Sequence, residues 1–193
     1  MRKLATKKDK ERKRKKQQVA LGLVLVLIMV MSAFGMVVGS FSPEGNKKVK
    51  YNGLEFYPDN NYWLTDIGEL TFKFRYNPKE TENVSNYILN QVPLATDYLS
   101  KPLYLSSSNQ EVLGEIYSNT KYFVERFQNA CLNESNCPED LPIKNCTENF
   151  IIIKEAEEPS LTIEENCVFI QGSQQDIVML TDEFLYKLLG IKQ

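Results

Sequence analysis

The longest apolar stretch of the chain lies near its beginning. Residues 19–39 read VALGLVLVLIMVMSAFGMVVG and contain no charged side chain. At about 1.5 Å of rise per residue, a helix of this length spans about 30 Å, the thickness of the hydrocarbon core of a bilayer. A helix buried in a protein core would need a polar stripe, and none is present. The pattern predicts a transmembrane helix over residues 19–39, with a signal peptide cleaved before Ser40 as the alternative.

Alternating apolar and polar positions begin after a short interruption. Residues 40–48 are rich in Ser, Gly, Pro and Lys and show no periodicity, so they predict a stalk that leads into a domain of residues 49–193. Asn52 and Gly53 stand between two alternating segments and indicate a hairpin, because both turn positions favour a positive φ. Further alternation over residues 62–76 extends this hairpin into a β-meander.

One pattern occurs twice in the predicted domain. Residues 103–113 (LYLSSSNQEVL) match residues 168–178 (VFIQGSQQDIV) position by position in character. Each copy predicts a strand, a turn of small residues and a helix. Two pairs have the spacing of a capping box at the start of a helix: Ser108 with Glu111, and Ser173 with Asp176. The first helix is expected to continue to Ala130, and the second to stop at Gly190, a natural C-cap.

The remaining segments complete the order of elements. Residues 82–91 predict a short helical stretch, and the apolar residues 150–153 predict a strand. A turn at residues 157–160 leads into strands from residue 161 towards residue 170, which are expected to pair antiparallel with residues 150–153. The predicted fold class is α+β, with helices covering one face of a mostly antiparallel sheet.

Charge is divided unevenly along the chain. Residues 1–20 hold ten basic and two acidic residues, a net charge of +8, out of 23 basic and 25 acidic residues in total, which leaves 13 basic and 23 acidic residues for the rest. Lys and Arg beside a span favour the cytoplasmic side. Residues 1–18 are therefore predicted to be a basic cytoplasmic tail, and the protein to be a single-pass protein of the cell membrane with its C-terminal domain outside. An additional contact of the tail with anionic lipid or RNA stays open, although nucleic acid is not an expected partner.

Four cysteines fall in the predicted extracytoplasmic part: Cys131, Cys137, Cys146 and Cys167. An even number of cysteines in an oxidising compartment indicates disulfides. The expected antiparallel hairpin brings Cys146 opposite Cys167, which leaves Cys131 to pair with Cys137 across a short loop. Zinc binding and free thiols are the alternatives, but the closely paired cysteines typical of a zinc site are absent.

The chain contains no histidine, which excludes Ser-His-Asp and Cys-His catalysis and removes the commonest transition-metal ligand. No catalytic, cofactor-binding or metal-binding residue is predicted. Acidic side chains at residues 155–165 leave calcium binding or a carboxylate pair open, although no defining spacing is present. Three N-x-S/T sequons are candidate glycosylation sites: Asn83, Asn133 and Asn145.

Several short motifs carry a resemblance. They are Y-N-G-x-x-F starting at Tyr51, F-x-Y-x-P starting at Phe74, N-C-V-F-I starting at Asn166 and D-E-F-L-Y-K-L-L-G-I starting at Asp182. In these the chain resembles a group of uncharacterised small single-pass surface proteins of archaea. The resemblance covers most of the predicted outer domain. It implies the plan of an anchor plus a domain and extracytoplasmic disulfides, and it implies no activity.

Three functions are compatible with these patterns. The favoured one is a non-enzymatic, membrane-anchored module that binds an envelope protein or surface component, with an exposed apolar or aromatic patch expected on the meander. The second is a structural subunit of an envelope assembly, which should associate with itself. The third is an extracytoplasmic carboxylate-dependent hydrolase, which needs two acidic side chains that converge in a cleft, one with a raised pKa.

Overall fold

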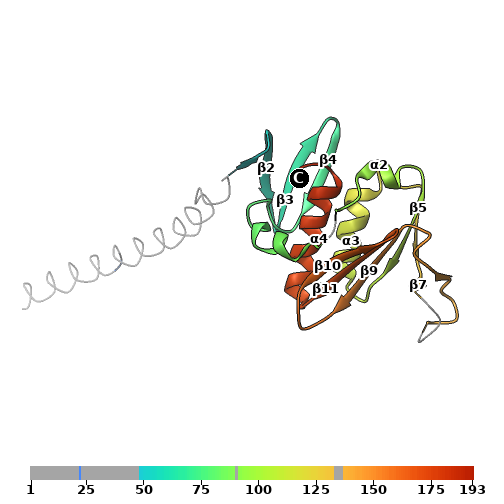
Figure 1. Ribbon diagram of the computed structural model, residues 1–193. Coiled ribbons are helices and arrows are strands. Elements are labelled where there is room, and N and C mark those ends of the chain that lie inside the picture. Colours follow the sequence, from blue (N-terminus) through green and yellow to red (C-terminus); the bar gives the residue numbers. More distant parts are fainter. Residues whose placement is uncertain (1–21, 23–47, 90, 133–136) are drawn as a thin grey trace, which may run out of the picture. The chain divides into compact units, whose positions relative to one another are not determined.

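The computed structural model describes residues 22, 48–89, 91–132 and 137–193. The chain divides into two compact units, Met1–Gly45 and Asn46–Gln193. The predicted basic tail, transmembrane helix and stalk lie outside the described residues, apart from Gly22 and Lys48. Within the described ranges, no helix has both the length and the apolar character that a membrane span requires. The second unit is an α+β domain (Figure 1).

The first sheet is the predicted meander. Its four antiparallel strands pair in chain order: β1 (Val49–Tyr51), β2 (Leu54–Asp59), β3 (Tyr62–Ile67) and β4 (Leu70–Phe74). Asn52 and Gly53 join β1 to β2 with φ angles of 45° and 80°, the positive values that a two-residue hairpin turn of this type needs. The predicted hairpin and meander are confirmed.

The second sheet has five strands in the order β10-β11-β9-β5-β6. The strands are β5 (Pro102–Ser106), β6 (Arg126–Asn129), β9 (Phe150–Glu155), β10 (Ser160–Glu164) and β11 (Cys167–Gly172). Only β10 and β11 pair antiparallel, whereas the pairs β11–β9, β9–β5 and β5–β6 are parallel. The expectation of a mostly antiparallel sheet is therefore wrong for this sheet.

The burial of β9 explains the parallel pairing. Its residues Phe150, Ile151, Ile152 and Ile153 are at most 5% exposed, as expected for a parallel strand covered on both faces. Ile151 and Ile153 belong to the main core, whereas Phe150 and Ile152 pack in a smaller cluster on the other face. A continuous apolar run fits this central position better than the antiparallel hairpin that the sequence suggested.

Two helices lie between the two sheets (Figure 1). They are α3 (Gln110–Thr120) and α4 (Gln174–Leu188). The ring of Tyr186 on α4 lies 5.8 Å from that of Phe56 and 4.3 Å from that of Phe74 in the meander. The same core includes Leu103 and Ile170 of the five-stranded sheet. The helices thus cover one face of that sheet, as predicted, and carry the meander on their other side, which the sequence did not predict.

Helix α4 begins and ends as predicted. Ser173 and Asp176 form the capping box, in which each side chain accepts from the other's backbone N–H. Gly190 has a φ of 70°, and the Ile191 N–H donates to the carbonyl of Tyr186 at 2.8 Å. This is the Schellman arrangement, which satisfies the last carbonyls of a helix and packs Ile191 back onto it.

Helix α3 differs from the prediction at both ends. Its N-cap is Asn109 rather than Ser108, and the Asn109 side chain accepts from two backbone N–H groups of the first turn. The helix ends at Thr120 rather than near Ala130. Beyond it, the Ser100 N–H donates to the carbonyl of Phe123 at 2.8 Å, so the chain turns back towards the start of β5 and continues as β6.

Short elements connect these layers. The predicted helical stretch at residues 82–91 is a 3₁₀ helix, η2 (Glu82–Tyr87), and the next helix along the chain is α2 (Ala95–Tyr98). Ile88 forms a parallel bridge with Leu161 of β10. Two short strands, β7 (Cys131–Leu132) and β8 (Ile143–Lys144), pair in parallel next to the cysteine-containing loop.

Candidate functional site

All four cysteines form disulfides with the predicted partners. Cys131 pairs with Cys137 and Cys146 pairs with Cys167, with Cα–Cα distances of 5.7 and 4.9 Å. No free cysteine remains. The zinc-site and free-thiol alternatives therefore do not describe this domain.

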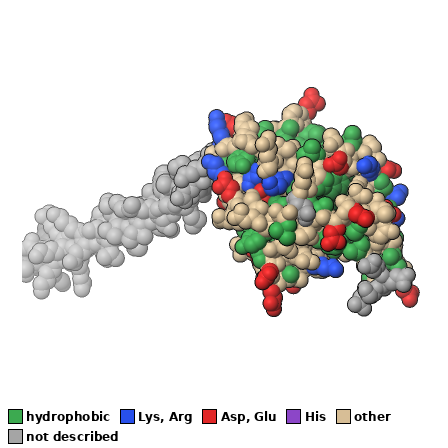
Figure 2. All heavy atoms as spheres, viewed as in Figure 1, with side chains coloured by type: hydrophobic (Ala, Val, Ile, Leu, Met, Phe, Trp, Pro, Cys, Tyr) green, Lys and Arg blue, Asp and Glu red, His purple; other side chains and the backbone are tan. Residues whose placement is uncertain are grey.

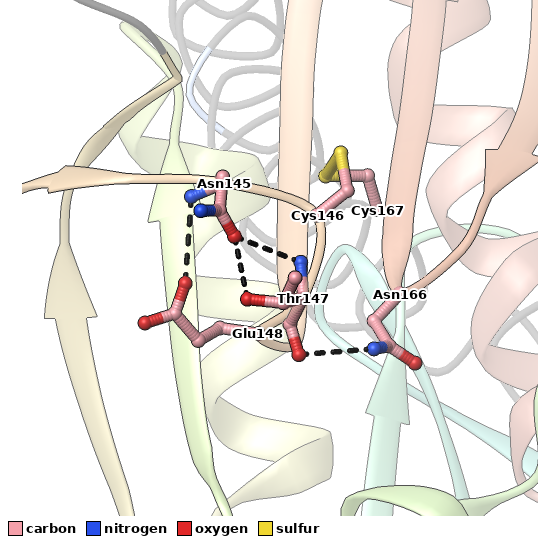
Figure 3. The surroundings of a disulfide bond; sticks show 6 residues. All are labelled: Asn145, Cys146, Thr147, Glu148, Asn166 and Cys167. Carbon is pink, nitrogen blue, oxygen red and sulfur yellow. Dashed lines mark hydrogen bonds between the residues drawn. A yellow bond between two sulfur atoms is a disulfide. The ribbon is translucent and has the colours of Figure 1, made fainter.

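The register used to predict the second disulfide is wrong, although the pairing is correct. Cys167 lies opposite Phe150 in a parallel ladder. Cys146 approaches from the turn before β9, where its carbonyl accepts from the Asn166 N–H at 3.1 Å. The Asn166 side chain also donates to the carbonyl of Thr147 at 3.1 Å (Figure 3). The disulfide thus joins this turn to the start of β11.

The structure places two of the three sequons. Asn145 is exposed, and its side-chain oxygen accepts from the N–H and the hydroxyl of Thr147 at 2.9 and 2.6 Å (Figure 3). Asn83 is exposed in η2, whereas the Ser85 hydroxyl of that sequon donates to the Glu183 carboxylate at 2.6 Å. Asn133 lies outside the described residues. Glycosylation of these residues stays a prediction.

The acidic residues at positions 155–165 do not form one site. Glu155, Glu157 and Glu158 lie at or before the start of β10, whereas Glu164 and Glu165 lie at its other end. In the described ranges, no group of three or more Asp, Glu or Cys side chains is arranged to hold a metal ion.

Side chains of the α3 region bind the outer edge of β4. The Asn119 side chain accepts from the Lys73 N–H at 2.9 Å and donates to the Lys73 carbonyl at 2.6 Å. The Tyr122 hydroxyl donates to the carbonyl of Thr71 at 3.1 Å. Asn119 thus makes the two hydrogen bonds that a neighbouring strand would make, which protects an edge that could otherwise pair with another chain.

Two buried carboxyl groups bind the backbone just beyond this edge of β4. Glu115 on α3 accepts from the Arg75 N–H, and Asp182 on α4 accepts from the Tyr76 N–H, each at 2.7 Å. Glu115 is 6% exposed and Asp182 is fully buried. Burial raises the pKa of Glu115, and it raises the pKa of Asp182 well above its usual value, to which the neighbouring Glu115 charge adds.

Glu115 is one of the residues that line a surface hollow. The hollow has a volume of about 270 Å³ and is lined by Tyr62, Lys73 and Glu111 among others. Sequence analysis missed this acid pair, although Glu115 follows Val112 by three positions within the apolar stripe of α3. A charged residue inside such a stripe indicates a buried acid.

A second polar cluster is an ion pair in the core. Lys192 donates to the Glu183 carboxylate, and both side chains are at most 4% exposed. The Thr81 hydroxyl donates to the same carboxylate at 2.7 Å. Every described polar group of this cluster is paired, so the cluster fixes η2 and the C-terminal residues against α4 rather than presenting a free reactive group.

Several of the most exposed apolar side chains lie at the end of η2 and in the residues after it. We call residues 87–99 the connector. Four of the eight large apolar side chains exposed among the described residues belong to it: Tyr87 at 41%, Leu89 at 69%, Leu94 at 52% and Leu99 at 56%. Figure 2 shows hydrophobic side chains exposed between polar and charged ones on the face in view.

Two hollows flank the connector. One has a volume of about 300 Å³ and includes Asp97 and Glu165, and the other has a volume of about 490 Å³ and includes Lys187. Gln91, Val92 and Leu94 line both. The connector thus lines two neighbouring hollows, and hollows with apolar walls can accept side chains of a bound segment.

Comparison with known proteins adds no relative: no protein-family model, no curated protein and no solved structure matches this chain.

Proposed function

We propose that the protein is a membrane-anchored interaction module of the cell envelope, whose extracytoplasmic domain binds an apolar segment of another envelope protein along the connector. One observation carries this proposal. Half of the large exposed apolar side chains of the described domain lie within residues 87–99. These side chains lie close together in the sequence, and exposed apolar side chains that share a surface mark interaction sites.

The exposed leucines of the connector offer apolar area that a partner can cover. Burying a fully exposed Leu contributes about 1.5–3 kcal/mol. Leu89, Leu94 and Leu99 are each at least half exposed, so covering all three contributes several times the roughly 1.4 kcal/mol that changes an affinity tenfold.

The apolar patch was expected on the meander, and this expectation was wrong. Among the described residues with large exposed apolar side chains, only Leu70 belongs to the meander.

The disulfides and the sequence of the N-terminal part support the location. Disulfides persist in oxidising compartments, and both of those expected for an extracytoplasmic domain are present. The apolar run at residues 19–39 and the basic residues before it indicate an anchor with the domain outside.

Photo-cross-linking in native cells tests the proposal. A photoreactive amino acid at Leu94 is expected to give a discrete cross-linked product with another envelope protein. The matched control is the same amino acid at Ile143, which is 51% exposed in β8, away from the connector. The product should be lost when Leu89 and Leu99 are changed to Asp, and equal cross-linking from both positions would contradict the proposal.

The same experiment addresses the structural-subunit alternative. A partner that proves to be a second copy of the chain would favour the envelope assembly over the binding module. Ordered self-association of the full chain after detergent extraction would support that reading.

The hydrolase alternative has one favourable observation, the raised pKa of the carboxyl pair of Glu115 and Asp182. Two hydrogen bonds and the burial of Asp182 favour a structural role for the pair. The carboxyl groups accept from the backbone N–H groups of Arg75 and Tyr76, and Asp182 has no exposed surface. A hydrolytic turnover that is lost in Glu115→Gln while the fold persists would favour the enzyme.

A further inference from the structure

The carboxyl pair leaves two oxygen atoms without a donor. Glu115 Oε1 and Asp182 Oδ2 accept from the N–H groups of Arg75 and Tyr76, just after β4, while Glu115 Oε2 and Asp182 Oδ1 are buried and have no hydrogen-bond partner among the described residues. The two carboxyl groups lie within hydrogen-bonding reach of each other. Ionised carboxylates only accept hydrogen bonds, so two ionised groups would leave both oxygens unpaired and repelling each other.

We propose that Glu115 and Asp182 bind one proton between them in the folded protein. This shared proton stabilises the packing of α3 and α4 against the end of β4, and it makes that packing sensitive to pH. A protonated carboxyl group is a donor. One proton therefore pairs both remaining oxygens and reduces the charge of the pair from two to one. The other two oxygens continue to accept from the backbone just after β4, so the proton completes the hydrogen bonding of the site.

The nearby cations, Lys73 on β4 and Arg75 just after it, do not replace this proton. The Arg75 guanidinium lies 3.6 Å from the Glu111 carboxylate and donates to the carbonyl of Asn61 at 2.9 Å. The Lys73 ammonium lies 3.7 Å from the ring centroid of Tyr62. Neither cation forms an ion pair with Glu115 or Asp182, and burial raises the pKa of Glu115 more strongly than the Arg75 charge lowers it.

The other ionisable groups around the pair favour the protonated state. Glu111, one turn before Glu115 on α3, raises the pKa of Glu115. From α4, the Tyr186 hydroxyl donates to the carbonyl of Tyr76 rather than to the pair. Burial and the charges of Asp182, Glu115, Glu183 and Glu80 raise the pKa of Tyr186 well above its usual value, so this phenol stays neutral. The site therefore contains an excess of acidic groups.

The direction of the pH effect follows from proton binding. In the unfolded chain the two carboxyl groups titrate at about pH 4. In the folded domain the pair keeps its last proton to a higher pH, because both pKa shifts are upward. Between these limits the folded state binds one proton more than the unfolded state, so the free energy of unfolding falls as pH rises. Below about pH 4 the shared proton gives its full stabilisation to the folded state, and above the pKa of the folded pair this stabilisation is lost.

Denaturant unfolding of the full chain in detergent, followed by the fluorescence of Trp63, tests whether the pair shares a proton. In Glu115→Gln the amide supplies a permanent donor to Asp182 and keeps the acceptor for the Arg75 N–H. Relative to this variant, the wild-type unfolding constant is expected to rise about tenfold per pH unit within the window, the signature of one proton. The exposed Glu125 serves as the control, and Glu125→Gln should keep the wild-type profile.

Infrared spectroscopy provides a readout that does not depend on unfolding. The wild type at neutral pH is expected to show the carbonyl band of a buried protonated carboxyl group, and this band should be absent in Glu115→Gln and in Asp182→Asn. The proposal is overturned if the wild type lacks that band at neutral pH. It is equally overturned if Glu115→Gln keeps the wild-type dependence of unfolding on pH.

Discussion

At the scale of single residues, polar side chains in the core take the place of a missing strand. Asn119 is fully buried and makes both backbone hydrogen bonds of Lys73. Glu115 and Asp182 accept from the N–H groups of Arg75 and Tyr76, the two residues that follow Phe74 at the end of β4. An exposed sheet edge is a site of unwanted pairing, and here helices packed against the meander close that edge without adding a strand.

Replacing Asn119 should reveal the importance of this edge. Asn119→Ala leaves the N–H and the carbonyl of Lys73 without protein partners, and we expect a loss of about 2 kcal/mol in the free energy of unfolding. The neighbouring Ser118 on the same helix donates only to the carbonyl of Gly114, so Ser118→Ala should change stability by less than about 0.5 kcal/mol. Urea unfolding at fixed pH measures both, and equal effects would show that Asn119 does not hold the edge.

At the scale of elements, the two disulfides constrain segments of different length. The Cys146–Cys167 bond closes 21 residues and the Cys131–Cys137 bond closes 6. Cys167 is fully buried at the start of β11, whereas Cys131 is only partly buried in β7. The longer link therefore stabilises the five-stranded sheet directly, and the shorter one joins β7 to the segment before β8.

Removing each disulfide should separate these contributions. In the chain-entropy relation, the longer loop corresponds to about 3 kcal/mol and the shorter one to about 2 kcal/mol. The double variant Cys146→Ala/Cys167→Ala should therefore lose more stability than Cys131→Ala/Cys137→Ala, and the cavity left by Cys167 adds to that loss. Thermal unfolding under non-reducing conditions compares them. A larger loss from the Cys131–Cys137 pair would contradict this assignment.

The elements that could be predicted from the sequence are those set by local chemistry. Asn52 and Gly53 determine a hairpin whatever surrounds them, and Ser173 with Asp176 determines where α4 begins. The orientation of β9 could not be predicted in this way, because the apolar residues 150–153 fit either a parallel or an antiparallel neighbour. Likewise, Phe123 and Phe127 continue the helical spacing of α3, but backbone pairing with β5 takes over beyond Thr120.

The candidate sites also differ in how far the sequence alone predicts them. The cysteine partners were predicted from an antiparallel register that the structure does not have, and the pairing is still correct because Cys146 lies in the turn just before β9, which pairs with the strand that Cys167 begins. The acid pair was not predicted, since Glu115 and Asp182 lie 67 positions apart by the numbering and meet only because α3 and α4 both pack against β4. The exposed leucines of the connector were missed because a single sequence does not show which apolar residues a fold leaves uncovered.

At the scale of the whole molecule, the sequence predicts an anchored domain with its N-terminus inside. Protease added to intact cells or spheroplasts should remove a tag at the C-terminus and leave a tag at the N-terminus intact, because the basic residues 1–18 stay cytoplasmic. The reverse pattern would show that the orientation is wrong. A mature chain that begins at Ser40 would show a cleaved signal peptide instead of an anchor.

Binding through the connector is the central claim, and hydrogen exchange in native envelopes tests it most directly. Backbone amides of residues 88–99 should exchange more slowly in native envelopes than in the purified full chain, because a bound partner excludes water from them. Amides of β8 serve as the internal reference and should exchange equally in both preparations. Slower exchange confined to the connector is the predicted result, whereas identical exchange of the connector in envelopes and in the purified protein would contradict the proposed function.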